Sequence, residues 1–191
     1  MHNDHADRLA SAADVIAQLR RPDLVEALQR ASMAVCECLQ SGGTILIAGN
    51  GGSAADASHL AAEFVGRCTT ERHGLPAISL ADASATITAL GNDYGFERVF
   101  ARQVEAFAQP GDVLIVLSTS GTSPNIVAAL DAARARGITT IAFGGRDGGQ
   151  MLTRSDVALI APSDVTARIQ ECHQVWAHVL AEDVDRLWAE E

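Results

Sequence analysis

The sequence Thr44-Ile-Leu-Ile-Ala-Gly-Asn-Gly-Gly-Ser53 joins an apolar run to a glycine-rich turn, and a helical pattern continues from it to Glu63. The run from Thr44 to Ala48 is short, apolar and rich in β-branched residues, which is typical of a buried parallel strand. The glycines free the backbone for a sharp turn, and Ser53 is expected to cap the next helix. Backbone N–H groups at such a helix start bind phosphate without lysine or arginine. We therefore expect an anion site here.

The remainder of the chain repeats this alternation of apolar runs and helical patterns. Strands are expected over residues 44–48, 77–80, 113–117, 139–143 and 157–161. Helices are expected over residues 4–19, 23–40, 82–89, 96–108 and 125–136, after Ser53, and from Ser163 to the end; the helix over 82–89 should end at Gly91-Asn92-Asp93. This order predicts an α/β fold with a five-stranded parallel sheet, covered by helices on both faces in the flavodoxin-like manner.

A second loop suited to an oxyanion follows the strand over 113–117. It reads Ser118-Thr119-Ser120-Gly121-Thr122-Ser123-Pro124, and its proline suits the first position of a helix. One serine would be enough to cap that helix, so the four hydroxyl groups of Ser118, Thr119, Ser120 and Ser123 favour a bound ligand over a cap alone. A nucleotide is disfavoured, because the chain has no G-x-x-x-x-G-K-[ST] motif and residues 49–53 do not fit G-x-G-x-x-G.

Polar residues on two helices provide candidate chemistry. His59 and Glu63 are four residues apart and therefore share one helix face, and the last helix carries Gln170, His173 and His178 among apolar residues. A single histidine is more often a surface or hydrogen-bonded interior residue. A carboxylate with imidazoles is the usual pair for proton abstraction beside a carbonyl. The same donors also suit zinc, so both interpretations stay open.

Composition limits the classes of partner. A chain of 191 residues with 48% hydrophobic content suits one domain, 1–191, including an N-terminal helical segment over 1–41. No apolar run approaches about 20 residues and the N-terminus lacks signal-peptide features, so a cytoplasmic protein is expected. The net charge of −10 argues against nucleic acid and acidic membranes. Cys36, Cys38, Cys68 and Cys172 form no C-x-x-C pair, which predicts buried free thiols.

The motifs together resemble those of one known family, the phosphoheptose isomerases among the sugar isomerase (SIS) domain proteins, over nearly the whole chain. The segments that carry the resemblance are Gly49-Asn50-Gly51-Gly52-Ser53, Asp56-x-x-His59-x-x-x-Glu63, Asn92-Asp93-Tyr94, Ser118-Thr119-Ser120-Gly121-x-Ser123 and Arg168-Ile169-Gln170-Glu171-x-His173. The resemblance implies a ketose–aldose isomerase that converts D-sedoheptulose 7-phosphate to D-glycero-D-manno-heptose 7-phosphate through a cis-enediol, the first step of activated heptose biosynthesis.

The resemblance also implies roles for individual residues. Glu63 and His178 would be the acid/base pair. One Zn²⁺ per subunit would be held by His59, Glu63, Gln170 and His178. The substrate would be bound by Asn50, Gly51, Gly52, Ser53, Glu63, Asn92, Asp93, Ser118, Thr119, Ser120, Ser123 and Gln170.

Three alternatives to this function remain. One is a non-catalytic SIS paralogue that binds a replication initiator, and such paralogues replace the residues that correspond to Glu63 and His178. Another is a sugar-phosphate-sensing module, which is normally fused to a DNA-binding domain. The third is an isomerase of a different ketose phosphate. The presence of Glu63 and His178 favours an enzyme over the first alternative. The second is disfavoured because this sequence shows no helix-turn-helix before this domain and its net charge of −10 does not suit DNA.

The last helix also predicts assembly. Its apolar residues fall on more than one face, so another subunit is expected to cover part of it, together with the N-terminal helices. Gln170 and His178 are eight residues apart, a rise of about 12 Å, so both would reach one site only under strain. We therefore expect composite active sites, with His178 or a neighbour crossing from an adjacent subunit, in the homotetramer that the resemblance implies.

Overall fold

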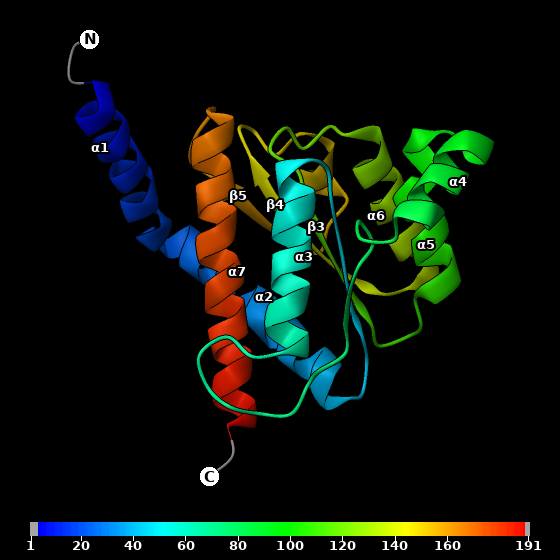
Figure 1. Cartoon of the computed structure of the whole chain (residues 1–191). Coiled ribbons are helices and arrows are strands. Elements are labelled where there is room, and N and C mark those ends of the chain that lie inside the picture. Colours follow the sequence, from blue (N-terminus) through cyan, green and yellow to red (C-terminus); the bar gives the residue numbers. More distant parts are fainter. Residues whose placement is uncertain (1–3, 190–191) are drawn as a thin grey trace.

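A five-stranded parallel sheet forms the centre of the computed structural model, which describes residues 4–189 (Figure 1). Residues 1–3 and 190–191, the two ends of the range expected to form one domain, lie outside the described residues. The strand order is β2-β1-β3-β4-β5, which confirms the flavodoxin-like expectation. The strands are β1 (Ile45–Gly49), β2 (Ala77–Ser79), β3 (Val113–Leu117), β4 (Thr139–Gly145) and β5 (Val157–Ala161).

Helices cover both faces of this sheet because β1 and β3 are apolar on both sides. Successive residues of β1 point to opposite faces, so Ile45 and Ile47 join one core while Leu46 and Ala48 join the other. The first core is completed by α2 (Pro22–Gln40), α3 (Gly52–Val65) and α7 (Thr166–Trp188). The second is completed by α4 (Ser84–Tyr94), α5 (Val99–Phe107) and α6 (Pro124–Arg136). Short 3₁₀ turns are η1 (Gln18–Arg20), η2 (Phe96–Arg98) and η3 (Gly149–Thr153).

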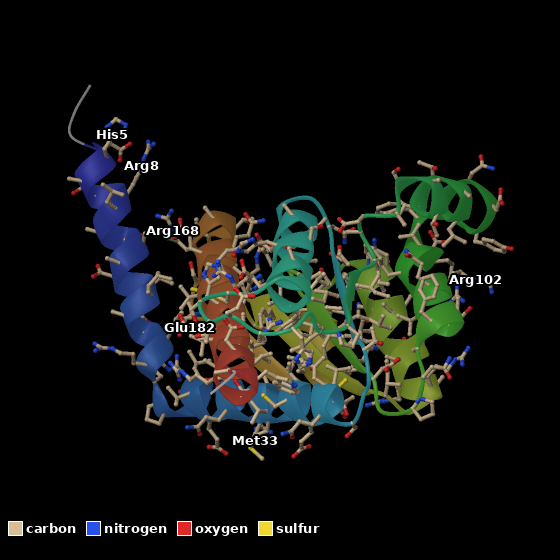
Figure 2. All side chains as sticks on the ribbon, turned by 60° about the horizontal axis from the view of Figure 1, so that its bottom comes forward. His5, Arg8, Met33, Arg102, Arg168 and Glu182 are labelled. Carbon is tan, nitrogen blue, oxygen red and sulfur yellow. The ribbon has the colours of Figure 1, made fainter. Side chains whose placement is uncertain are left out.

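The first helix, α1 (Asp4–Ala17), stands apart from these layers. Figure 2 shows its outer end, with His5 and Arg8, away from the sheet. None of its residues is buried, and its link to α7 includes a hydrogen bond from Arg168 Nη1 to the Arg8 carbonyl (2.9 Å). Within residues 4–189, no helix combines the length and the apolar content that crossing a membrane requires.

The start of α3 differs from the sequence prediction. Ser53 was expected to cap this helix, but the N-cap is Gly51, whose φ of 57° is easily adopted only by glycine, and no side-chain cap is formed. Ser53 is buried inside the first turn, where its N–H donates to the Asn50 carbonyl (3.0 Å). The expected serine cap is therefore wrong, and the N–H groups of the turn are presented by glycine.

Two other helix boundaries were also predicted wrongly. The helix over 82–89 was expected to end at Gly91-Asn92-Asp93, but α4 continues through these residues and ends before Gly95, whose φ of 86° leaves the helical region. A single glycine inside a helix costs only about 1 kcal/mol, which neighbouring turns offset. The last helix begins at Thr166 and not at Ser163, because Val165 is still extended (φ −90°, ψ 116°).

The cysteines are free, as predicted. Cys38 and Cys172 are buried, and Cys36 and Cys68 are half-buried. Burial raises the pKa of Cys38 and Cys172 to about 11.

Because the thiolate is the reactive form, we expect Cys38 and Cys172 to react with a thiol reagent at pH 7.5 roughly 100-fold more slowly in the native protein than after unfolding. The measurement is the time course of labelling, read residue by residue by peptide mass spectrometry. Equal rates in the native and the unfolded protein would contradict this prediction.

Candidate active site

Helices α3 and α7 lie side by side and run in the same direction, and polar contacts join them at successive levels (Figure 1). Near their N-termini, Gln170 packs so closely on Gly52 that a Cβ atom there would lie 2.2 Å from its Nε2. One turn further along, Gln174 Nε2 donates to Asp56 Oδ1 (2.5 Å). Burial raises the pKa of Asp56, against the opposing effects of Gln174 and His59. The facing sides of the two helices therefore form one polar seam, the α3–α7 seam.

A cavity of about 250 Å³ lies at the N-terminal end of this seam, beyond the carboxyl ends of β1 and β3. This is the position at which ligands bind in open parallel sheets. Seven of the expected substrate-binding residues line the cavity, together with Leu117 and Thr166. The seven are Asn50, Gly52, Ser53, Ser118, Thr119, Ser123 and Gln170.

The cavity suits an oxyanion although none of its lining residues among positions 4–189 is an arginine and the chain carries a net charge of −10. The helices α3, α6 and α7 all begin at or beside it, with Gly52, Pro124 and Thr166 as their first residues. Helix N-termini carry partial positive charge and unpaired N–H groups. Hydroxyl groups add further donors, and two of them, on Ser118 and Ser123, lie 3.2 Å apart.

The two anion-binding loops are joined by a reciprocal amide pair. Asn50 Nδ2 donates to Asn125 Oδ1, and Asn125 Nδ2 donates to Asn50 Oδ1, both at 2.8 Å. Asn125 is buried at the start of α6, whereas Asn50 also lines the cavity. The pair fixes the loop after β1 relative to the loop after β3.

A cluster of three titratable side chains lies further along the seam. His59 Nε2 is 3.0 Å from His178 Nε2 and 3.5 Å from Glu63 Oε1. One ligand atom of each residue lies within 4.8 Å of the others. The Glu63 side chain is 18% exposed, so the carboxylate is accessible but partly desolvated. This arrangement can exchange protons with a substrate or hold a metal ion.

Comparison with known proteins assigns the family. Residues 4–145 match the SIS domain. The chain is 54% identical to the phosphoheptose isomerase of Roseiflexus sp. (strain RS-1) over 157 residues, which are 82% of this chain and 80% of that protein. It is 51% identical to the Helicobacter pylori (strain P12) phosphoheptose isomerase over 166 residues, which are 87% of this chain and 86% of that protein. The chain belongs to the phosphoheptose isomerase family.

A solved structure supports this membership. The phosphoheptose isomerase from Neisseria gonorrhoeae superposes on this chain with a TM-score of 0.90 at 40% identity, covering 96% of this chain and 97% of that one. The expected SIS fold and family are thus confirmed.

Not every residue expected from the phosphoheptose isomerase motifs lies at the cavity or the cluster. Gln170, an expected zinc ligand, lies with Gly52 at the cavity, whereas His59, Glu63 and His178 are gathered further along the seam. Asn92 and Asp93 lie on α4, where the Asn92 amide donates to the Asp93 carboxylate (2.7 Å). Gly51 is exposed beside the cavity, and the Ser120 hydroxyl accepts from the Thr122 N–H (3.3 Å).

The expected crossing of His178 from an adjacent subunit is not needed for its contact with Glu63. One chain brings the two residues together because His59 and Glu63 on α3 face His178 across the seam. As anticipated, the rise along α7 keeps Gln170 and His178 apart. The two residues lie at different features of the seam: Gln170 lines the cavity, and His178 belongs to the cluster with His59 and Glu63.

Two residues were missed by sequence reasoning. Thr166 lines the cavity as the first residue of α7, and its only signal was a hydroxyl residue at a helix start. Asn125 follows Pro124 inside α6, where a short polar residue is expected to face solvent. Its partner, the half-buried Asn50, is 75 residues away, so no local pattern could have identified the pair.

The loop after β3, residues 118–123, makes one close contact with the loop around Gly148. Gly121 has a φ of 66°, and a Cβ atom at this position would lie 2.1 Å from the Gly148 carbonyl oxygen. Gly137, at the end of α6, has nearly the same φ of 67° but open space around it.

We expect Gly121→Ala to lower the free energy of unfolding by about 3 kcal/mol and to reduce kcat/KM by tenfold or more, because displaced hydroxyl groups no longer meet the substrate phosphate. Gly137→Ala, the matched control, should cost about 1 kcal/mol and leave kcat/KM unchanged. Chemical unfolding and steady-state kinetics measure both. If both substitutions had equal effects, the positive φ alone would explain why residue 121 is glycine, and the close approach to the Gly148 carbonyl would not matter.

Proposed function

We propose that this chain isomerises D-sedoheptulose 7-phosphate to D-glycero-D-manno-heptose 7-phosphate. The observation that carries the proposal is the combination of Glu63 with two imidazoles at one level of the α3–α7 seam and an oxyanion cavity at another. The relatives named phosphoheptose isomerase, at about half identical residues, support the same substrate.

The spacing of the two features supports a long substrate. Gly52 at the cavity and His59 at the cluster are seven residues apart on α3, and Gln170 and His178 are eight residues apart on α7. These separations correspond to rises of about 10 and 12 Å. An extended seven-carbon sugar phosphate spans about 10 Å from C1 to its phosphorus, given C–C bonds of about 1.5 Å. A phosphate in the cavity would therefore place C1 and C2 beside Glu63.

The proposed steps use residues of one chain. The Ser118–Ser123 loop, Asn50 and Ser53 bind the phosphate of the opened ketose and so align the other end. Glu63 removes a proton from C1, which gives a cis-enediol, and returns a proton to C2. His178 takes the proton from the O1 hydroxyl and gives one to O2. The sum is a ketose converted to an aldose, with no net gain or loss of protons.

We also propose that the cluster holds one Zn²⁺. Two imidazoles and a carboxylate with a free fourth position are the donor set of many catalytic zinc sites, so His59, Glu63 and His178 fit the ion. Gln170, expected as a further ligand, has its amide at Gly52. When bound, Zn²⁺ would supply Lewis-acid polarisation of the substrate carbonyl.

We further propose that the chain forms a single SIS domain that assembles as a homotetramer. Residues of α2 share one core with α3 and α7, which supports a common domain. Two observations support an interface with another subunit. The described helix α1 has no buried residue, and the apolar side chains of Val165, just before α7, and Leu187, on α7, are exposed.

The substrate proposal is tested by comparing ketose phosphates of five, six and seven carbons under identical conditions, with product detection by NMR. We expect the highest kcat/KM for the seven-carbon substrate, because only this length links cavity and cluster. A clear preference for a shorter ketose phosphate would support the alternative isomerase. Failure of all three would favour a non-catalytic SIS protein.

A further inference from the structure

The loop that follows α3, residues 66–76, passes across the C-terminal half of α7 (Figure 1). One carboxylate on α7, Asp185, holds it there. Its Oδ2 accepts from three consecutive backbone N–H groups, those of Cys68 (3.1 Å), Thr69 (2.5 Å) and Thr70 (2.9 Å). Its Oδ1 accepts from Arg72 Nε (2.8 Å). The side chains of Asp185 and Arg72 are both fully buried.

The Nη1 and Nη2 atoms of the Arg72 guanidinium donate to backbone carbonyls at the end of α3 and in the loop that follows it. Nη2 donates to the carbonyl of Glu63 (2.7 Å), and Nη1 donates to the carbonyls of Phe64 (2.9 Å), Gly66 (3.0 Å) and His73 (3.0 Å). Carbonyls in the last turn of a helix lack partners within the helix, and a cation there also meets the negative end of the helix dipole. Arg72 therefore caps α3 at the turn that carries Glu63.

Stability alone does not explain this arrangement well. Desolvation of two charges can cost as much as their attraction returns, and apolar residues of similar volume often replace buried ion pairs without loss. Burial raises the pKa of Asp185, but the hydrogen bonds from Thr70, Thr69 and Arg72 outweigh this effect, so its pKa is lowered and the carboxylate form of Asp185 is favoured. A fully paired buried network fixes geometry, which is what an acid/base site requires.

The geometry links the pair to the cluster on both helices. Arg72 bonds directly to the backbone of Glu63, and Asp185 lies seven residues beyond His178, on the same face of α7. The pair therefore connects the turn of α3 that holds the base to the helix that holds the imidazole.

We propose that Arg72 and Asp185 are positioning residues for the isomerase site, which hold the Glu63 turn against α7 so that the carboxylate stays beside His59 and His178. This inference rests on the proposed function. The pair touches neither substrate nor metal, and it acts through Glu63.

The substitution Arg72→Lys tests this positioning role. Lysine keeps the positive charge but cannot donate the five hydrogen bonds that the Arg72 guanidinium makes. We expect kcat to fall about 10- to 100-fold and Zn²⁺ affinity, measured by competition with a chromogenic chelator, to weaken about tenfold. KM should change by less than about threefold, since the phosphate loops lie at the other end of the seam. Asp185→Asn should act in the same direction.

Asp156→Asn is the matched control, because Asp156 also accepts from a backbone N–H and a side chain of Thr140 (2.8 and 2.7 Å), but far from the cluster. It should lower the unfolding temperature without changing kcat or Zn²⁺ affinity. Three outcomes would overturn the inference. Folded Arg72→Lys could keep the wild-type kcat and Zn²⁺ affinity, or Asp156→Asn could lose as much of both as Arg72→Lys does. The third outcome is that neither Arg72→Lys nor Asp185→Asn folds. An inactive wild type would instead contradict the proposed function, and the Zn²⁺ affinities would still decide this inference.

Discussion

Glu63→Gln is expected to lower kcat by about 10²- to 10⁴-fold while the protein stays folded and still binds substrate. Glutamine has nearly the size of glutamate, so the α3–α7 seam and the Arg72 contact to the backbone carbonyl of residue 63 can persist. The amide, however, cannot accept the C1 proton. Steady-state kinetics measure kcat, and calorimetric titration with the sugar phosphate measures binding.

Glu182→Gln is the control for this experiment. Glu182 lies on α7 (Figure 2), four residues after His178, and pairs with Arg186 (3.6 Å). It is not part of the cluster of His59, Glu63 and His178. Its replacement removes the same charge near the site and should leave kcat within about twofold of the wild type, as most surface substitutions do. Turnover by Glu63→Gln close to that of Glu182→Gln would refute the role of Glu63 as the base.

Mixing two inactive chains, Glu63→Gln and His178→Ala, is expected to restore no activity. Because one chain brings Glu63 and His178 together, every site in a mixed oligomer would lack one of the two groups. If His178 instead met Glu63 across a subunit interface, random mixing would give both groups to about a quarter of the sites. Native mass spectrometry confirms that mixed oligomers form, and the assay then reads zero or about a quarter of wild-type activity.

The fold was predictable where the local sequence pattern and the packing of the whole sheet require the same structure. The apolar runs predicted strands β3 and β5 with correct bounds. In β3, where every residue is buried, a parallel strand needs such an unbroken apolar segment. Helix ends were harder to predict. Gly51 and Gly95 mark the true boundaries because each adopts a positive φ, whereas Ser53 and Gly91 carry equally good local signals and lie inside helices.

The site was predictable only in part. The pairing of His59 with Glu63 follows from helical periodicity, but the identity of His178 as their partner came from the family resemblance, since nothing local places α7 beside α3. The Asn50–Asn125 and Arg72–Asp185 contacts join residues 75 and 113 positions apart, and each member looks locally like an ordinary surface residue. Burial, which the sequence does not display, is what distinguishes Asn125, Arg72 and Asp185 from surface residues.

The central claim is that Glu63, beside His59 and His178 of the same chain, removes a proton from C1 of a seven-carbon ketose phosphate and, after exchange with solvent, delivers a proton to C2. NMR in D₂O, with D-sedoheptulose 7-phosphate as substrate, tests this claim most directly. The account predicts that the wild-type protein forms an aldose heptose 7-phosphate with solvent deuterium at C2, and that Glu63→Gln forms none. The absence of an aldose product from the wild-type protein, or its formation at the same rate by Glu63→Gln, would contradict the account.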